Sequence, residues 1–211
     1  MDNVEASRKF LRGDRSPQVC STLKNASDAF STVWYDFIPQ RPALLARYSF
    51  AERHLKTKIH KGELLEVGSW TGSFAKNYKN LGYKVTCLDG CYSCGELVRE
   101  TGVDEFVYAR LDDVVITKKF DVICAFEILE HLVDPDRAVS MLKNMLNPDG
   151  LFLITVPTEH CVFDGYTAND YPGGEHIQSI SESRIRGWGF QETTKYFSGG
   201  EYDWYMASYI P

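Results

Sequence analysis

An apolar strand pattern that breaks into a glycine-containing turn constrains this chain more than any other feature. The run ELLEVGSWTGSF, residues 63 to 74, begins as an apolar strand and places Gly68 and Gly72 before a helical pattern. Glycines permit a sharp bend and a close approach of the backbone to a ligand, and a helix that begins near Gly72 directs its first amides at that ligand. The run therefore predicts a ligand-binding turn, for a ligand with negative charge or many hydrogen-bond acceptors.

The spacing of this turn differs from that of a dinucleotide site. Such a site has three glycines in the order G-x-G-x-x-G, with a phosphate at the helix end. Here Glu66 ends the strand, and Gly68 and Gly72 follow it. A carboxylate at this position repels a pyrophosphate and suits an ammonium group. A nicotinamide oxidoreductase is therefore disfavoured, although it shares the fold class.

Acidic residues also end the strands predicted further along the chain. Residues 83 to 89 form a second strand that ends in Asp89, at the distance where doubly wound nucleotide-binding folds place a ribose-binding carboxylate. The pair Asp112 and Asp113 follows a short strand pattern, and Glu127 follows an apolar one. Because ligands bind at the carboxyl ends of parallel strands, we expect these residues to share one site.

Three further motifs follow the glycine turn: the strand FDVI at 120–123, the segment LEHL at 129–132 with Asp134-Pro135, and the pattern L-PDG-L-I-VP at 146–157. These four motifs, in this order, resemble those of class I S-adenosylmethionine-dependent methyltransferases. The family's glycine turn usually has a middle glycine, where this chain has Trp70, and this change would either tighten the methionine pocket or weaken cofactor binding. The resemblance covers roughly residues 60 to 160.

The alternation of strand and helix patterns predicts an α/β fold. With the resemblance, it implies a doubly wound, mainly parallel seven-stranded sheet with an antiparallel C-terminal edge hairpin, the Rossmann-like methyltransferase fold. Two helices precede the first strand, the first of them over residues 29–38. The expected order is then strand 63–67, helix 72–81, strand 83–88, helix 93–101, strands 105–109 and 120–126, helix 134–146, strand 150–156, helix 181–188 and strands 190–197 and 202–210.

Length and composition favour one soluble domain. We expect residues 1–60 to form a leader and a helical cap, and residues 61–211 to form the S-adenosylmethionine-binding domain. A formal charge of −6 without a sustained basic run disfavours a nucleic-acid partner. The sequence shows no signal peptide and no membrane-spanning run, so we expect no membrane association and a cytoplasmic location, with reduced cysteines.

The resemblance assigns roles to residues at the strand ends. Glu66 and Gly68 would lie beside the methionine moiety of the cofactor, S-adenosylmethionine. Asp89 would bind the ribose, and Asp112 would be the acid on the adenine side. The end of the fourth strand would flank the transferred methyl group. The expected cofactor-binding set is therefore Glu66, Gly68, Trp70, Gly72, Asp89, Asp112, Phe126 and Glu127.

A hydroxyl acceptor needs a group that takes its proton, and histidine is the usual base near neutral pH. His131 follows the fourth strand, His160 follows the fifth, and His176 lies in the long polar segment after it. These three histidines are the catalytic candidates. For His131 there is an alternative, because in this motif it can simply brace a helix.

The segment EILEH, residues 127 to 131, raises a metal-dependent alternative. If it is helical, Glu127, Glu130 and His131 share one face and, with His176, would bind a divalent cation. This spacing resembles the metal site of small-RNA 3′-terminal 2′-O-methyltransferases, and it also occurs in quinone-precursor O-methyltransferases. Because the low basic character argues against an RNA substrate, no residue is assigned as a metal ligand.

The leading prediction is an S-adenosylmethionine-dependent methyltransferase that acts on an oxygen, or with less support a nitrogen, of a small-molecule acceptor. One alternative is a cation-assisted methyltransferase on a nucleic-acid end. Another is a non-catalytic, cofactor-binding interaction module, which the presence of Trp70 favours. An edge strand ending in Trp204, Tyr205 and Met206 would let two copies pair as a homodimer.

Overall fold

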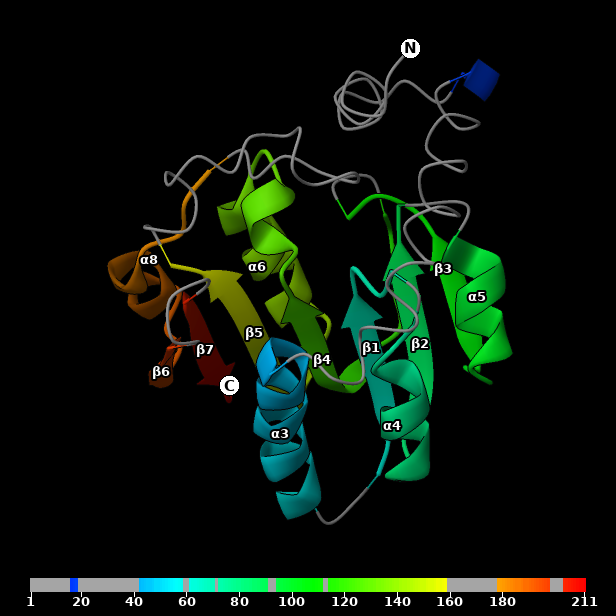
Figure 1. Cartoon of the computed structure of the whole chain (residues 1–211), viewed down its shortest axis with the longest axis horizontal. Helices are drawn as coiled ribbons and strands as arrows, with labels where there is room; N and C mark the ends of the chain where they lie inside the picture. The colour runs from blue at the N-terminus through cyan, green and yellow to red at the C-terminus, as the bar shows by residue number, and fades with distance from the viewer. Residues whose placement is uncertain are drawn as a thin grey trace.

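The computed structural model describes residues 16–18, 42–58, 61–70, 72–90, 94–111, 114–158, 178–197 and 203–211. These residues form a seven-stranded sheet in the order β3-β2-β1-β4-β5-β7-β6, and the strands lie side by side in this order in Figure 1. The first five strands are parallel, whereas β7 is antiparallel to both β5 and β6. The predicted fold class is confirmed, including the C-terminal antiparallel hairpin.

The central strands are buried on both faces, which explains their nearly continuous apolar sequences. In β4, for example, every residue except Asp121 is buried. The strand bounds are β1 (Glu63–Val67), β2 (Lys84–Asp89), β3 (Glu105–Tyr108), β4 (Phe120–Phe126), β5 (Leu146–Pro157), β6 (Glu192–Phe197) and β7 (Asp203–Tyr209).

Helices cover the two faces of the sheet and form two separate apolar clusters with it. One face is covered by α3 (Pro42–Thr57), α4 (Ala75–Asn80) and α5 (Cys94–Glu100), and the other by α6 (Pro135–Asn144) and α8 (Glu182–Gly187). Phe50, Ala51 and Leu55 of α3 are buried in the same cluster as residues of β1 and β4. The helix before the first strand therefore packs directly on the sheet, in one of its two core clusters.

The Asp-Pro pair after the LEHL motif has a local structural role. The carboxylate of Asp134 accepts a hydrogen bond of 2.9 Å from the backbone N–H of Arg137, and Pro135 is the first residue of α6. An acidic cap followed by proline is a strong helix start, because the carboxylate satisfies a free amide and proline lacks the amide that would otherwise be unpaired.

Several predicted bounds were displaced, and one expectation was wrong. The helix predicted from residue 72 begins at Ala75, because Gly72 adopts a left-handed φ of 70° and remains in the turn. The last strand is not an edge, since β7 lies between β5 and β6, and residues Trp204 to Met206 are buried. The homodimer argument from that edge therefore fails. The helix predicted over residues 29–38 lies outside the described residues.

Candidate cofactor and acceptor site

The strand order changes direction between β1 and β4, and the crevice at the carboxyl ends of these strands is the usual ligand site of such a sheet. The segments that follow these two strands contain the two non-glycine residues with positive φ among the described residues, Trp70 at 44° and Glu127 at 52°. Left-handed backbone is strained for such side chains and clusters at ligand-binding sites. Backbone strain and sheet topology therefore both indicate a ligand site at the carboxyl ends of β1 and β4.

The glycines of the first turn have a packing reason as well as a conformational one. Gly68 has a φ of 70°, and a Cβ built on it would lie 2.9 Å from the side chain of Ile128, which follows β4. A Cβ on Gly72 would lie 3.2 Å from Thr101, just after α5. The N–H of Gly68 donates to the carbonyl oxygen of Leu88 at 2.8 Å, which anchors the turn across the end of β2.

Asp89 lies at the end of β2, directly beside this turn, as the sequence predicts. Its Oδ2 accepts a hydrogen bond of 2.7 Å from the backbone N–H of Trp70. In the sheet Asp89 is aligned with Tyr108 of β3. The carboxylate is thus held beside the glycine turn and next to the end of β3, at the carboxyl ends of the parallel strands.

Glu66 lies below the turn, inside the cluster that α3 and α4 cover. Its side chain is buried, and it is aligned with Cys87 of β2 and Cys124 of β4. The Cys87 thiol donates to Oε2 of Glu66 at 3.5 Å. Burial raises the pKa of Glu66 to about 8, so the carboxyl group is mainly protonated at neutral pH. A ligand ammonium near this group would favour its ionised form.

Glu127 is held by donors from three other elements. Its Oε1 accepts from the hydroxyl of Thr155 on β5 at 2.8 Å, and its Oε2 accepts from the indole N–H of Trp204 on β7, also at 2.8 Å. Arg47 of α3 forms an ion pair with Oε2 at 3.0 Å, and its guanidinium lies 4.7 Å from the centre of the Trp204 ring. Burial raises the pKa of Glu127, and the Arg47 charge and the two hydrogen bonds oppose that effect.

The EILEH segment does not form the single helical face on which the metal alternative was based. Leu129–His131 is one 3₁₀ turn, and the left-handed Glu127 before it directs its carboxylate toward Arg47, Thr155 and Trp204. Glu130 is buried, 3.8 Å from Nε2 of His131, and burial raises its pKa well above the usual range. Among the described residues, no three acidic, histidine or cysteine side chains converge well enough to hold a metal ion.

The remaining predicted residues are divided between the core and undescribed segments. Phe126 is buried, and its ring packs edge to face against Phe74 at 5.9 Å. Asp112, His160 and His176 lie outside the described residues. Of the catalytic histidines, His131 is thus the one that the structure describes, next to the buried Glu130.

The sequence analysis missed Arg47, Thr155 and Trp204. The Trp204 contact joins residues 77 positions apart in the chain, and neither a helical nor a strand pattern indicates such a pairing. The available signal for Arg47 was its place in the first ten residues of the helix, 42–51, where it is the only charged residue, because a half-buried arginine is normally paired.

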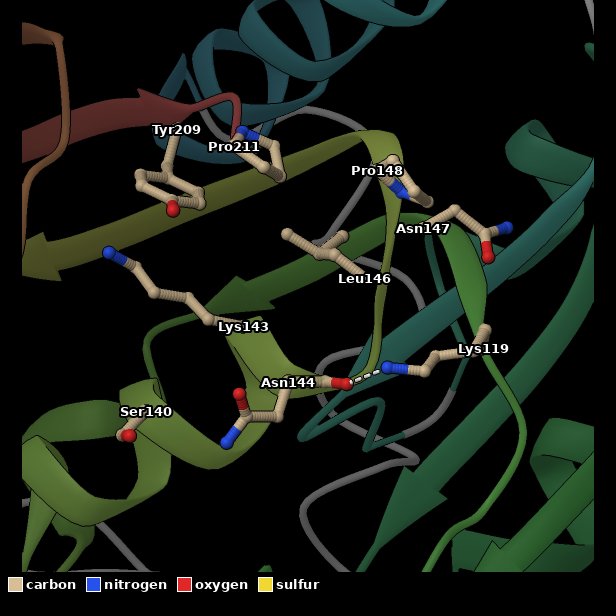
Figure 2. Close-up of a pocket in the computed structure, with 9 residues that line it drawn as sticks. All are labelled: Lys119, Ser140, Lys143, Asn144, Leu146, Asn147, Pro148, Tyr209 and Pro211. Carbon is tan, nitrogen blue, oxygen red and sulfur yellow. Dashed lines mark hydrogen bonds between the residues drawn. The ribbon is translucent and has the colours of Figure 1, made fainter.

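A cavity of about 660 Å³, whose lining residues are drawn in Figure 2, lies at the other end of the central strands, where β4 and β5 begin. It adjoins the C-terminal end of α6 and the start of β5, whereas Trp70 and Glu127 follow the carboxyl ends of the strands. It is therefore separate from the crevice between β1 and β4. Its lining residues are Lys119, Ser140, Lys143, Asn144, Leu146, Asn147, Pro148, Tyr209 and Pro211.

Comparison with known families decides what this arrangement is. A family model described as a methyltransferase domain matches residues 37–209, which is most of the chain. The chain belongs to this methyltransferase-domain family. The match begins before α3 and ends with β7, so it includes the elements that supply Arg47 and Trp204. The resemblance to class I S-adenosylmethionine-dependent methyltransferases is confirmed.

Curated relatives of this methyltransferase domain are distant. The ubiquinone biosynthesis O-methyltransferase of Xanthomonas euvesicatoria is 27% identical over 165 residues, which cover 70% of this chain and 69% of that protein. The enzyme of the same name from Rickettsia canadensis is 26% identical over 102 residues, which cover 46% of this chain. This match spans 43% of the length of the Rickettsia protein.

Solved structures share the fold of this methyltransferase domain over nearly its whole length. The N-methyltransferase NodS from Bradyrhizobium japonicum, in complex with S-adenosylhomocysteine, has a TM-score of 0.68 at 14% identity and covers 100% of this chain and 98% of its own. The 1,6-didemethyltoxoflavin-N1-methyltransferase of Burkholderia thailandensis, also with S-adenosylhomocysteine, has a TM-score of 0.65 at 17% identity, with 93% and 91% covered. These complexes agree with S-adenosylmethionine as the expected cofactor.

Within the described part of the chain, no helix has both the length and the apolar character needed to cross a membrane.

Proposed function

We propose that this methyltransferase domain uses S-adenosylmethionine to methylate an oxygen atom of a small molecule. The observation that carries the proposal is the glycine turn after β1, whose left-handed Trp70 donates its amide to Asp89 at the adjacent strand end. This contact supports Asp89 as the carboxylate that would bind the ribose, because the turn lies at the point where the strand order reverses. The curated relatives named as O-methyltransferases support oxygen, and less directly a small acceptor.

The residues present fit this cofactor chemically. Asp89 offers a carboxylate to the ribose hydroxyls, and Gly68 and Gly72 permit the left-handed bends of the turn and its close packing on Ile128 and Thr101. Glu66, buried directly beneath, would become a carboxylate close to the ammonium group. Asp112 would serve the adenine side, and Phe126 would form the apolar wall behind the methyl group.

Methyl transfer from a sulfonium requires in-line approach and electrostatic support more than covalent help. When bound, S-adenosylmethionine supplies the methyl group, whose bond to sulfur breaks as its bond to the acceptor oxygen forms. Glu127 has its carboxylate engaged by Arg47, Thr155 and Trp204, so we assign it to fixing the turn after β4 rather than to accepting a proton. The proton of the acceptor hydroxyl would pass to His131, His160 or His176.

Isothermal titration of the purified chain with S-adenosylmethionine and S-adenosylhomocysteine tests the proposal. We expect both to bind, and Asp89→Asn to weaken both, because it removes the charge that the ribose hydroxyls bind. A chain that binds neither would refute the cofactor assignment. Binding without turnover on a broad panel of phenols, catechols and other hydroxyl acceptors would instead support a non-catalytic module. A cytoplasmic location and a homodimer stay predictions.

A further inference from the structure

Two exposed aromatic side chains flank Asp89. Trp70 follows β1 and is 38% exposed, and Tyr108 ends β3 and is 40% exposed. The Trp70 amide is bonded to the Asp89 carboxylate at 2.7 Å, and Tyr108 is the residue aligned with Asp89 in the adjacent strand. Tyr108 lies one strand away from Asp89, at the usual spacing of about 4.8 Å, and Trp70 is hydrogen-bonded to Asp89 from the other side, so both aromatic residues lie next to the same carboxylate.

The backbone at Trp70 is strained. Trp70 has a φ of 44°, between Gly68 and Gly72, which both have a φ of 70°. A glycine would adopt this conformation freely, whereas any side chain there is strained. Trp70 belongs to neither apolar cluster of the described residues. A strained, partly exposed tryptophan at the turn after β1 indicates a role in binding.

We propose that Trp70 and Tyr108 are the aromatic walls of the nucleoside half of the cofactor site, and that they stack on the purine while Asp89 binds the ribose. This inference rests on the proposed function. It assigns Trp70 to the nucleoside and not to the methionine, because its amide is bonded to the carboxylate that would hold the ribose. Stacking of a base on an aromatic side chain contributes about 1–3 kcal/mol, which is enough to offset the strained backbone.

The test compares two ligands that differ in their amino-acid half. S-adenosylhomocysteine contains both halves, and 5′-methylthioadenosine lacks the amino acid. Trp70→Gly should weaken both ligands by the same factor, about 5- to 20-fold, which corresponds to the lower part of the stacking range. Trp70→Phe keeps a ring and should restore binding to within about threefold, and Tyr108→Ala should weaken both ligands as Trp70→Gly does.

The controls separate stacking from folding. Trp188→Ala removes an indole from the opposite face of the sheet, where it packs against the cluster of α6 and α8, and it should leave both affinities unchanged. Trp70→Gly relieves backbone strain, so its melting temperature should equal or exceed that of the wild type. Tyr108 is exposed, so its removal should also leave the fold intact.

Three results would overturn the inference. If Trp70→Gly bound both ligands as tightly as the wild type, or more tightly, the indole would contribute nothing to binding or would obstruct the site. Loss of S-adenosylhomocysteine affinity with unchanged 5′-methylthioadenosine affinity would place Trp70 beside the methionine. A wild-type chain that binds neither ligand would refute the proposed function together with this inference, whereas a failure confined to the variants would leave the proposed function intact.

Discussion

Replacing Thr155 by valine tests the network around Glu127 with the smallest change in shape. Thr155 is fully buried in β5, and its hydroxyl donates to Oε1 of Glu127 at 2.8 Å. Valine keeps the β-branched shape and removes the hydroxyl. The carboxylate then loses one of its donors in a place where water has little access.

The expected loss follows from the charge of the acceptor. A hydrogen bond to a charged group contributes about 1.5–3 kcal/mol, and a buried oxygen left without its donor bears the cost of desolvation. We therefore expect Thr155→Val to lower the free energy of unfolding by about 2 kcal/mol. For a chain of this size that corresponds to a drop of about 4–8 °C in melting temperature.

The chain offers a matched control in β2. Thr86 is also buried, at 2% exposure, but its hydroxyl donates at 3.3 Å to Glu105, whose side chain is 53% exposed. Water can replace that donor, so Thr86→Val should change the free energy of unfolding by less than about 0.5 kcal/mol. Both variants are measured by urea unfolding and by thermal melting of the intact chain.

A double-mutant cycle with Glu127→Gln assigns the loss to the pair. If the Thr155 hydroxyl acts through the carboxylate, Thr155→Val should cost clearly less when residue 127 is already a glutamine. Equal losses for Thr155→Val and Thr86→Val, or the same loss in both backgrounds, would refute the argument that Glu127 is a tightly held charge.

Three further predictions concern the cofactor side of the site. The pKa of Glu66 is about 8 in the fold, against an ordinary value of 4.5, so the native state holds a proton that the unfolded chain releases near pH 5. The free energy of unfolding of the wild type, relative to that of Glu66→Gln, should therefore fall as pH rises from about 5 to about 8. Urea unfolding at several pH values measures this, and a constant difference would contradict it. Asp89→Asn should weaken S-adenosylhomocysteine by about tenfold by titration calorimetry, and unchanged affinity would remove Asp89 from the site. A chelator should leave the affinity for S-adenosylhomocysteine unchanged in the same titration, because no three metal-ligating side chains converge among the described residues. A lower affinity in the presence of chelator would favour the metal-dependent alternative.

The sequence by itself determined the succession of strands and helices along the chain and the positions of the glycine turn and of the acidic strand ends. Burial on both faces makes parallel strands read as apolar runs, and glycine or acid at the run ends marks the turns, so Gly68, Gly72 and Asp89 were located from local pattern alone. The C-terminal hairpin was found for the same reason. These features depend on residues close together in sequence, which periodicity reports directly.

Only the tertiary structure decided which groups meet. The order β5-β7-β6 placed Trp204 inside the sheet, where an edge had been expected, and brought it to Glu127 together with Arg47 and Thr155. The left-handed φ of Glu127 turned the carboxylate away from the helical face that its spacing with His131 implied. Contacts between elements far apart in the chain depend on how strands are ordered and how helices pack across them, and a linear pattern of residues contains neither.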